Sequence, residues 1–350
     1  MRAFELVGPG RSVVRDVAPP VAAPGWVVLD IARVGVCGTD MEMFAGTMEY
    51  LHTGLATYPL RLGHEWCGTV SSLGEGVDPA WLGRRATGDT QIGCGTCHRC
   101  RTGRQHTCAD RHEIGLRRGF DGALAEQMAV PASALLALPD SVDDTAGAMV
   151  EPGGNALRAV RAAGVASGER LLVIGPGTIG LLAAMFAMAQ GCEVHVLGVD
   201  PATLDIALRH GVAGAWTRET LPDLRWDAVV DASNHVSSPA LAAELVDAGR
   251  RIVLIGLSDA ASLLDTRTLV MKDAQAIGIL SASPGLAGAI ELYASGAVDP
   301  RTLVAATLGL DEVDGVLAGR RPAHAGPGPK IHIDPTHVSG EDHHDRPHPS

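Results

Sequence analysis

The alternation of strand-like and helix-like stretches after Gly168 constrains the fold more than any other feature of this sequence. Short apolar stretches predict strands, and the longer stretches between them predict helices. The predicted strands are 171–174, 193–198, 226–231, 251–257 and 276–280, and the predicted helices follow Gly180 and cover 202–210 and 239–247. Strands that alternate with helices of this length form right-handed crossovers, so this part of the chain predicts a doubly wound parallel sheet.

The chain before about residue 150 has a different pattern. Short alternating stretches such as 26–31 and 68–73 are separated by Gly, Pro and Asp, which predicts an all-β domain. The predicted fold class is therefore α/β plus all-β. We expect the all-β domain at 1–155, the parallel-sheet domain at 156–285, a return to the first domain at 286–334 and a tail at 335–350. The tail combines histidines with acids and prolines, so we expect it to be disordered, with weak metal binding as the alternative.

Charge and hydropathy exclude several classes of function. The 350 residues carry 28 basic and 40 acidic side chains, a formal net charge of -12, which gives no general attraction to nucleic acid or to an anionic membrane surface. The first residues lack the apolar core of a signal peptide, so we expect a cytoplasmic protein. The uncharged run from Leu171 to Cys192 is long enough to span a bilayer, but its glycines and proline favour a buried strand, a turn and a helix.

Four of the seven cysteines form the motif Cys94-x2-Cys97-x2-Cys100-x7-Cys108. Three thiols with this spacing can converge from a loop, and the fourth completes a tetrahedron, so the motif predicts a structural-zinc lobe at about 94–108. An iron–sulfur cluster is less favoured, because the ferredoxin motif has a shorter last gap and a proline after the final cysteine. A disulfide framework is not expected in a chain without an export signal.

A glycine motif, Gly175-x-Gly177-x-x-Gly180, follows the first predicted strand of the parallel sheet and begins a helix. In a dinucleotide-binding unit the first glycine makes a tight turn, the second lets the pyrophosphate approach the backbone, and the third packs the helix on the strand. Thr178 and Ile179 would then lie at the helix N-terminus, which faces the phosphate charge. A glycine-rich turn without a ligand is the alternative.

A third set of candidate residues is scattered along the chain. Cys37 lies in the segment Gly-Val-Cys-Gly-Thr-Asp, the pair His64-Glu65 follows Gly63, and Glu151 lies in Val-Glu-Pro-Gly-Gly-Asn. Taken singly, these residues are explained as a buried thiol, a core histidine and surface carboxylates. Beside a dinucleotide-binding unit they indicate a catalytic zinc with Cys, His and carboxylate ligands and one open position.

At these residues the sequence resembles the zinc-containing medium-chain alcohol and polyol dehydrogenases. The likeness runs over about residues 1–334 and includes, in the family's order, the Cys-Gly-Thr-Asp turn, the Gly-His-Glu block, the four-cysteine lobe, the Val-Glu-Pro block and the glycine motif. It implies a GroES-like catalytic domain at 1–155, a Rossmann dinucleotide-binding domain at 156–285 and two zinc ions per chain. We also expect a homodimer or homotetramer.

The resemblance implies a role for each residue of the metal site. Cys37 and His64 would bind zinc, and Glu65 would be a neighbouring carboxylate able to approach the metal. Glu151 would be a ligand too, because it stands where polyol and sugar dehydrogenases carry glutamate and where alcohol dehydrogenases carry a second cysteine. Which of the two glutamates binds zinc in the resting enzyme stays open.

The resemblance also implies roles around the metal. The hydroxyl of Thr39 would accept the substrate proton, Asp40 would orient the imidazole of His64, and Asn155 would touch the nicotinamide. Many relatives have a histidine that passes the proton to solvent, and this chain has Glu42 there. The outer part of the proton relay is therefore not defined by the resemblance.

The nucleotide site departs from the family pattern at the end of the second strand. The family places an acidic residue there to bind the ribose hydroxyls, but this chain has Gly198, and Asp200 is the expected substitute. The stretch 192–208 contains no Lys or Arg that would pair with the 2′-phosphate of NADP. The sequence therefore predicts NAD rather than NADP.

Together these features predict hydride transfer between a secondary alcohol of a sugar, polyol or cyclitol and NAD(P), with zinc making the alcohol ionisable near neutral pH. Two alternatives stay open: a simple-alcohol or amino-alcohol dehydrogenase on the same scaffold, and a non-catalytic nucleotide-binding protein that keeps the fold. The expected substrate is a small polar alcohol. Polar residues after Cys37, including Tyr50 and His52, either bind its hydroxyls or belong to a solvated loop.

Overall fold

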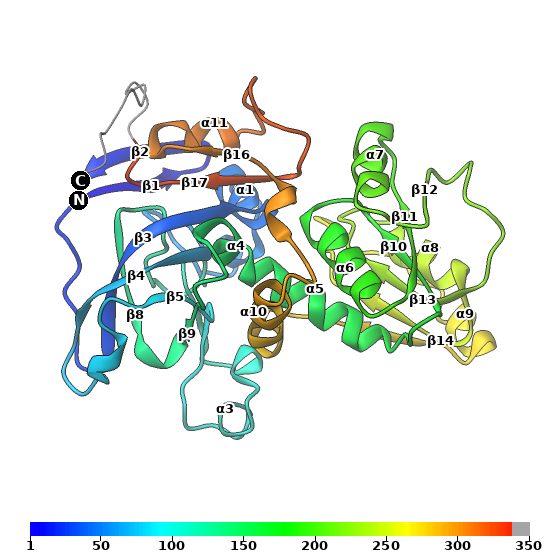
Figure 1. Cartoon of the computed structure of the whole chain (residues 1–350), viewed down its shortest axis with the longest axis horizontal. Helices are drawn as coiled ribbons and strands as arrows, with labels where there is room; N and C mark the ends of the chain where they lie inside the picture. The colour runs from blue at the N-terminus through cyan, green and yellow to red at the C-terminus, as the bar shows by residue number, and fades with distance from the viewer. Residues whose placement is uncertain (338–350) are drawn as a thin grey trace, which may run out of the picture.

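We describe residues 1–337 of a computed structural model, so most of the predicted tail, 338–350, lies outside the described residues. One sheet is parallel throughout. Its strands are β10 (Arg170–Ile174), β11 (Glu193–Leu197), β12 (Gly214–Trp216), β13 (Trp226–Asp231), β14 (Val246–Leu254) and β15 (Gln275–Gly278). Their order in space is β12-β11-β10-β13-β14-β15 (Figure 1). The chain builds one half of the sheet outward from β10 and then returns to build the other half, which is the topology of dinucleotide-binding domains.

Helices cover both faces of this sheet. They are α5 (Val150–Ala163), α6 (Thr178–Ala189), α7 (Pro201–Arg209), α8 (Ser238–Leu245) and α9 (Thr266–Lys272). Leu171 and Val173 pack in one core with residues of α5, α6 and α7, whereas Leu172 and Ile174 pack in another core with residues of α8 and α9. Because successive side chains of a strand point to opposite faces, a strand covered on both sides is an unbroken apolar run.

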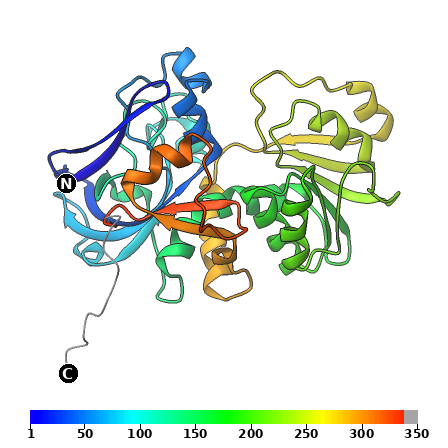
Figure 2. The ribbon, with the colours of Figure 1, turned by 90° about the horizontal axis from the view of Figure 1, so that it is seen from above.

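The other large sheet is mostly antiparallel. Its strands are β3 (Trp26–Val36), β4 (Glu65–Leu73), β5 (Arg85–Gly88), β8 (Gln127–Pro131), β9 (Leu135–Ala137), β16 (Val304–Leu308) and β17 (Lys330–Ile333). The order is β16-β17-β3-β4-β5-β9, and β8 pairs with β3. Strand β17 is antiparallel to β3 with Ile331 opposite Val36, so residues near 330 lie beside the end of β3 (Figure 2).

Smaller elements complete the described part of the chain. The remaining strands are β1 (Arg2–Gly8), β2 (Arg11–Asp16), β6 (Gln91–Ile92) and β7 (His112–Glu113), and β1 pairs with β2 and β6 with β7. The remaining α-helices are α1 (Gly38–Ala45), α2 (Glu49–His52), α3 (His98–Arg101), α4 (Asp144–Ala148), α10 (Leu286–Ala294) and α11 (Val313–Leu317). Short 3-10 turns are η1 (Pro79–Trp81), η2 (Gln105–Thr107), η3 (Ala132–Ala134), η4 (Ser283–Gly285), η5 (Pro300–Leu303) and η6 (Leu310–Glu312).

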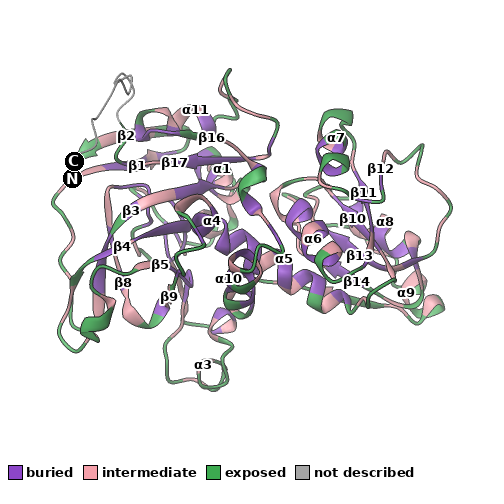
Figure 3. Ribbon diagram, viewed as in Figure 1, coloured by how far each residue is buried: buried purple, intermediate pink, exposed green. Residues whose placement is uncertain are grey.

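Helix α5 connects the two sheets. Its first turn lies beside β4, its later turns pack on α6, and α10 packs along it (Figure 1). The burial colours show α5 and the central strands as buried and much of the α3 segment as exposed (Figure 3). The predicted domain boundary at residue 155 falls inside this continuous helix. The division into 1–155, 156–285 and 286–334 therefore stays a prediction.

The predicted elements of the parallel sheet exist, but several ends were wrong. Helix α6 begins at Thr178 rather than after Gly180, because Gly177 is its N-terminal cap. Strand β14 ends at Leu254 rather than at 257, since the amides of Ile255 and Gly256 both donate to the Asp231 carbonyl and turn the chain away. The same strand begins at 246 rather than 251, before an irregularity in its pairing with β13.

The fold class predicted from the sequence is confirmed, with short helices interrupting the β-rich first part. The uncharged run from Leu171 to Cys192 forms most of β10, the glycine turn and α6, as predicted. Among residues 1–337, we find no helix with the length and apolar character needed to cross a membrane.

Candidate active site

Cys37 lies at the junction between β3 and α1, where the local sequence fixes its position. The residue is the N-cap of α1: its sulfur accepts a hydrogen bond from the amide of Thr39 at 3.4 Å. In return, the Asp40 carboxylate accepts a hydrogen bond from the Cys37 amide at 3.0 Å. These two bonds form a capping box, which satisfies amides at the start of the helix. The thiol is therefore held at the end of β3 by its own neighbours in sequence.

His64 lies immediately before β4, after a glycine that no other residue can replace without strain. Gly63 has a φ of +104°, and a Cβ there would lie 2.7 Å from the amide nitrogen of Leu124. The Nδ1 atom of His64 lies 3.3 Å from Oδ1 of Asp40. Burial lowers the pKa of His64, but the charges of Asp40 and Cys37 outweigh it, so the pKa is raised well above its ordinary value. Asp40 thus lies close to both the turn that holds Cys37 and the imidazole, and its orienting role stays a prediction.

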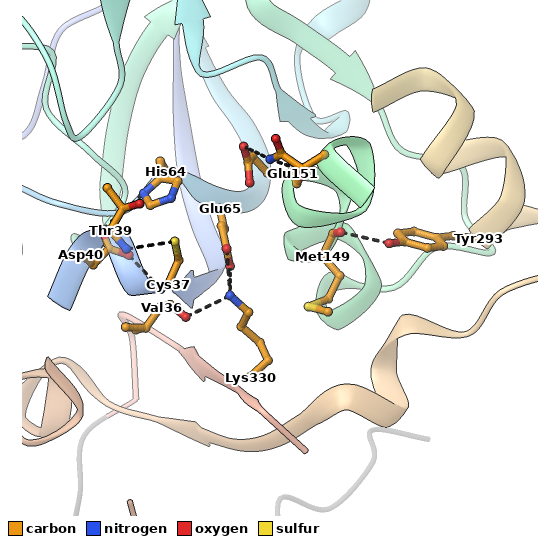
Figure 4. Close-up of polar contacts among 11 residues, drawn as sticks. Val36, Cys37, Thr39, Asp40, His64, Glu65, Met149, Glu151, Tyr293 and Lys330 are labelled. Carbon is orange, nitrogen blue, oxygen red and sulfur yellow. Dashed lines mark hydrogen bonds and ion pairs between the residues drawn. The ribbon is translucent and has the colours of Figure 1, made fainter. Parts of the chain in front are cut away.

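The structure brings Cys37, His64 and Glu65 together. One potential ligand atom from each of the three lies within 4.8 Å of the others, and the two latter side chains are buried (Figure 4). Thiolate, imidazole and carboxylate are the donor types that zinc binds in proteins. The chemistry and spacing of this cluster therefore fit a zinc ion.

Glu65 has a partner that sequence reasoning missed. The Nζ atom of Lys330, on β17, donates to both carboxylate oxygens of Glu65 at 2.8 and 2.7 Å and to the carbonyl of Val36 at 2.9 Å. Both side chains of the pair are 3% exposed. A Cβ on Gly35 would lie 2.0 Å from Oε2 of Glu65, so the carboxylate occupies the space that this glycine leaves free.

Glu151 lies beside this cluster but outside it. It is in the first turn of α5, it is buried, and its Oε1 accepts a hydrogen bond from Nδ2 of Asn155 at 2.8 Å (Figure 4). Burial raises the pKa of the Glu151 carboxyl to about 7, and the nearby Glu65 adds to this effect. A buried carboxylate without a cationic hydrogen-bond partner is costly, so this position suits a cation. Asn155, predicted to touch the nicotinamide, contacts Glu151 here.

The four predicted lobe cysteines converge. The sulfur atoms of Cys94, Cys97, Cys100 and Cys108 all lie within 4.8 Å of one another, with Cys97 at 3.5 Å from Cys100 and at 3.8 Å from Cys108. Gly93 makes room for them, since a Cβ there would lie 2.5 Å from the sulfur of Cys100. Four converging thiols suit a closed tetrahedral zinc site.

The glycine motif forms the turn between β10 and α6 at the carboxyl end of the parallel sheet. Gly175 has a φ of +96°, which favours glycine, and a Cβ on Gly180 would lie 1.9 Å from the carbonyl oxygen of Gly175. Gly177 has open space around it, and Thr178 and Ile179 begin α6. The strand order reverses between β10 and β13. In doubly wound parallel sheets, ligands bind at the carboxyl ends of the strands beside this reversal. Each glycine therefore meets the requirement that the sequence motif predicts.

The end of β11 explains why Gly198 replaces the family's acidic residue. A Cβ on Gly198 would lie 2.9 Å from Cγ of Pro176 and 3.1 Å from Cδ2 of Leu204, so a larger side chain needs these neighbours to move. Asp200 is exposed two residues later and caps α7, where its Oδ1 accepts from the amide of Ala202 at 3.1 Å. One carboxylate oxygen of Asp200 remains for a ligand.

A dinucleotide-binding turn and a buried thiol–imidazole–carboxylate cluster in one chain define a nucleotide-dependent dehydrogenase, and comparisons with known proteins agree. Residues 23–140 match the family described as "Alcohol dehydrogenase GroES-like domain". The L-threonine 3-dehydrogenase of Idiomarina loihiensis is 31% identical over 268 residues, which is 73% of this chain and 77% of that protein. A zinc-binding dehydrogenase from Sinorhizobium meliloti, solved with NADP, has a TM-score of 0.87 at 26% identity, covering 95% of this chain and 99% of that one. An alcohol dehydrogenase from Escherichia coli CFT073, solved with NADH, shares the fold with a TM-score of 0.86 at 24% identity over 95% and 99%.

The chain belongs to the zinc-containing medium-chain alcohol and polyol dehydrogenase family. The resemblance noted in the sequence is thereby confirmed, and so is the prediction that the chain is a dehydrogenase. The individual zinc ligands, the substrate and the choice of nicotinamide cofactor remain to be proposed from the site itself.

Proposed function

We propose that this protein transfers a hydride between a secondary alcohol of a sugar, polyol or cyclitol and NAD. The observation that carries the proposal is the cluster of the half-buried Cys37 with the buried His64 and Glu65, and the buried Glu151 beside it. A merely structural remnant has no need for a buried carboxylate such as Glu151, whose side-chain hydrogen-bond partner, Asn155, is neutral, because burying a charge without a compensating cation costs free energy.

Two zinc ions per chain fit the residues. Cys37 and His64 would hold one ion with Glu151, while Glu65 is a second carboxylate within reach of the same place. Cys94, Cys97, Cys100 and Cys108 would hold the other. When bound, the first ion supplies a Lewis acid that lowers the pKa of an alcohol and so eases loss of its hydride to the nicotinamide.

The residues next to Cys37 have the positions needed to handle the proton. The hydroxyl of Thr39, in the first turn of α1, would accept it from the substrate. Asp40 would hold the His64 ring in one orientation through the 3.3 Å contact with Nδ1. Glu42, one turn further along α1, has its carboxyl pKa raised by burial and by Asp259. A carboxyl with a raised pKa can exchange protons closer to neutral pH, so we place Glu42 in the outer relay.

A specific observation favours a second candidate substrate. The relative from Idiomarina loihiensis named above is an L-threonine 3-dehydrogenase, and its name implies a secondary alcohol beside an amino group. The residues of the cluster would play the same part with both substrates, because the reacting secondary alcohol is the same. An amino alcohol is therefore the alternative to the polyol.

The first prediction tests the activity itself. Polyols, cyclitols, sugars and amino alcohols are offered with NAD, and the absorbance of the reduced nicotinamide is followed. We expect turnover with at least one secondary alcohol. We also expect the variant Glu151→Gln to lower kcat at least about a hundredfold, while its melting temperature stays near that of the wild type. Turnover that survives in Glu151→Gln would assign the third ligand position to Glu65 or water. No turnover with any alcohol by zinc-loaded protein would favour the non-catalytic nucleotide-binding protein.

The second prediction is a preference for NAD. Arg218 is already paired with Glu244 at 2.7 Å, and the stretch 192–208 contains no cation for a 2′-phosphate. A phosphate desolvated without a partner costs several kcal/mol, so we expect kcat/KM to favour NAD by about tenfold or more. Asp200→Asn keeps a good helix cap and removes the charge, so it should reduce this preference. A wild-type ratio that favours NADP by the same factor would contradict the assignment.

We also propose that the chain forms a homodimer or homotetramer. In the described part of the chain, β15 pairs only with β14, and the apolar side chains of Leu263, Val270 and Met271 nearby are more than three-quarters exposed, at 86%, 77% and 86%. An unpaired strand edge beside exposed apolar groups is a surface that proteins usually cover. Light scattering of the purified protein measures the state directly, and a monomer would contradict the proposal.

A further inference from the structure

A turn rich in arginine packs against the segment that leads to His64. Strand β7 ends at Glu113, and the amide of Arg117 donates to the Glu113 carbonyl at 2.8 Å to close the turn. A Cβ on Gly115, inside this turn, would lie 3.1 Å from both N and O of Gly63. The turn therefore touches the residue that precedes His64, and Arg117 lies two residues beyond that contact.

The guanidinium of Arg117 is buried without a counter-charge of its own. Arg117 is 7% exposed, its Cζ lies 5.6 Å from the centre of the Tyr50 ring, and its Nε makes no hydrogen bond. The Nε atom of Arg111 is buried and unbonded as well. Within residues 1–337, neither arginine forms an ion pair, whereas their neighbour Arg118 pairs with Asp110 at 3.7 Å.

The surrounding groups supply only part of the missing negative charge, which comes from Glu113. The carboxylate of Glu113 accepts a hydrogen bond from the Tyr50 hydroxyl at 3.1 Å but lies farther than 4 Å from the guanidinium nitrogens of Arg117. The pKa of Arg117 is lowered, by burial first and then by the charge of Arg111. A lowered pKa is what crowding of poorly solvated positive charges produces. Beside Tyr50, Arg111 and Arg117 therefore each keep a buried Nε donor without an acceptor, and within residues 1–337 neither positive charge has an ion-pair partner.

Burying a charge without a partner costs free energy, and the face of one tyrosine offsets only part of that cost. The planar guanidinium fork matches the oxygens of a carboxylate or a phosphate, and such charge-assisted bonds are roughly twice as strong as neutral ones. An anionic ligand would therefore offset the cost, in the turn whose Gly115 contacts the residue before His64.

We propose that Arg117 and Arg111, with Tyr50, form a subsite for an anionic oxygen group, a carboxylate or a phosphate, carried by the alcohol substrate. This inference rests on the proposed function, and it narrows the substrate from any secondary alcohol to one with an acidic group. Arg117 would be the specificity-determining residue, since it is the more buried of the two and stacks on Tyr50.

Binding of simple anions tests the subsite without turnover. The melting temperature is measured with increasing inorganic phosphate or, separately, acetate, at constant ionic strength and with saturating NAD to fill the nucleotide site. We expect both variants Arg117→Gln and Arg111→Gln to lose the stabilisation that the anion gives the wild type. Arg267→Gln, which removes an exposed arginine of α9, is the matched control and should keep it. The anion that stabilises the wild type more distinguishes a phosphate subsite from a carboxylate subsite.

Turnover provides the second readout. Arg117→Gln should lower kcat/KM for alcohols that carry the preferred anionic group about tenfold to a hundredfold and leave neutral alcohols unchanged. Equal anion stabilisation in wild type and Arg117→Gln, or none in the wild type, would overturn the subsite. Arg118 lines a separate hollow of about 280 Å³ against residues 54–60. If only Arg118→Gln lost the anion stabilisation, the anion would bind in that hollow, and the subsite at Arg117 would be overturned as well. If no alcohol is turned over but Arg117-dependent anion binding persists, the proposed activity fails and the anion site stands.

Discussion

Cys37→Ala should remove one of two zinc ions per chain and abolish turnover while the chain stays folded. The thiol of Cys37 is one of three side chains in the cluster within 4.8 Å, so its loss leaves too few strong donors for zinc. The lobe cysteines belong to a separate set, and nothing in their contacts involves Cys37. Elemental analysis of the purified variant should therefore find about one zinc where the wild type holds two.

Two further variants show whether the loss of zinc and turnover in Cys37→Ala comes from its own site or from general destabilisation of the fold. Cys192→Ala removes a buried thiol outside both sets and should keep both ions and the activity. Cys100→Ala should remove the other ion and lower the melting temperature more than Cys37→Ala does, because structural zinc contributes to folding directly. Loss of both ions in Cys37→Ala, or of neither, would contradict two independent sites.

Features that depend on neighbours in sequence were predictable from the sequence. The turn of Gly175 and the close approach of Gly180 are encoded within six residues, and each follows from steric limits on a Cβ. The N-cap at Cys37 is likewise made by Thr39 and Asp40. The glycine motif could be placed between a strand and a helix because the pattern on both sides was regular, whereas the helix that begins after Cys37 was not predicted.

Features that depend on distant pairing could not be predicted. Lys330 reaches Glu65 across 265 positions of sequence, and only the pairing of β17 with β3 places it there. In the sequence it is one lysine before a short apolar strand, which gives no signal of burial. The early end of β14 has the same origin, because the amides of the two residues that follow it, Ile255 and Gly256, both donate to the carbonyl of Asp231 on β13.

The resemblance to the dehydrogenase family grouped these scattered residues as candidates for one site, which their spacing in the sequence did not do. Cys37, His64 and Glu65 are brought together as a metal ligand set would be, whereas Glu151 is adjacent and bonded to Asn155. A family motif records which residue types recur, but the detailed positions of two competing carboxylates depend on their partners. Here Lys330 holds one of them and Asn155 the other.

Lys330→Met should lower the free energy of unfolding by about 3–5 kcal/mol, which is the usual effect of removing one partner from a buried ion pair. Burial alone lowers the pKa of Lys330, but Glu65 and Cys37 outweigh it and keep the ammonium charged. Removing that ammonium leaves the Glu65 carboxylate buried without its two hydrogen bonds of 2.7 and 2.8 Å. Urea unfolding of the zinc-loaded protein measures the loss.

The double variant Glu65→Gln, Lys330→Met decides whether the cost comes from the orphaned charge. If it does, removing the carboxylate as well should restore most of the stability lost in Lys330→Met, because a neutral pair no longer needs to be compensated. Arg2→Met is the matched control, since it breaks an exposed pair with Asp311 of similar length, 2.6 Å, and should cost less than about 1 kcal/mol. If Lys330→Met lowers the free energy of unfolding no more than Arg2→Met does, then Glu65 has another counter-charge in the folded enzyme. The bound metal would then be the group that holds Glu65, and Lys330 would only fill the space between β3 and β17.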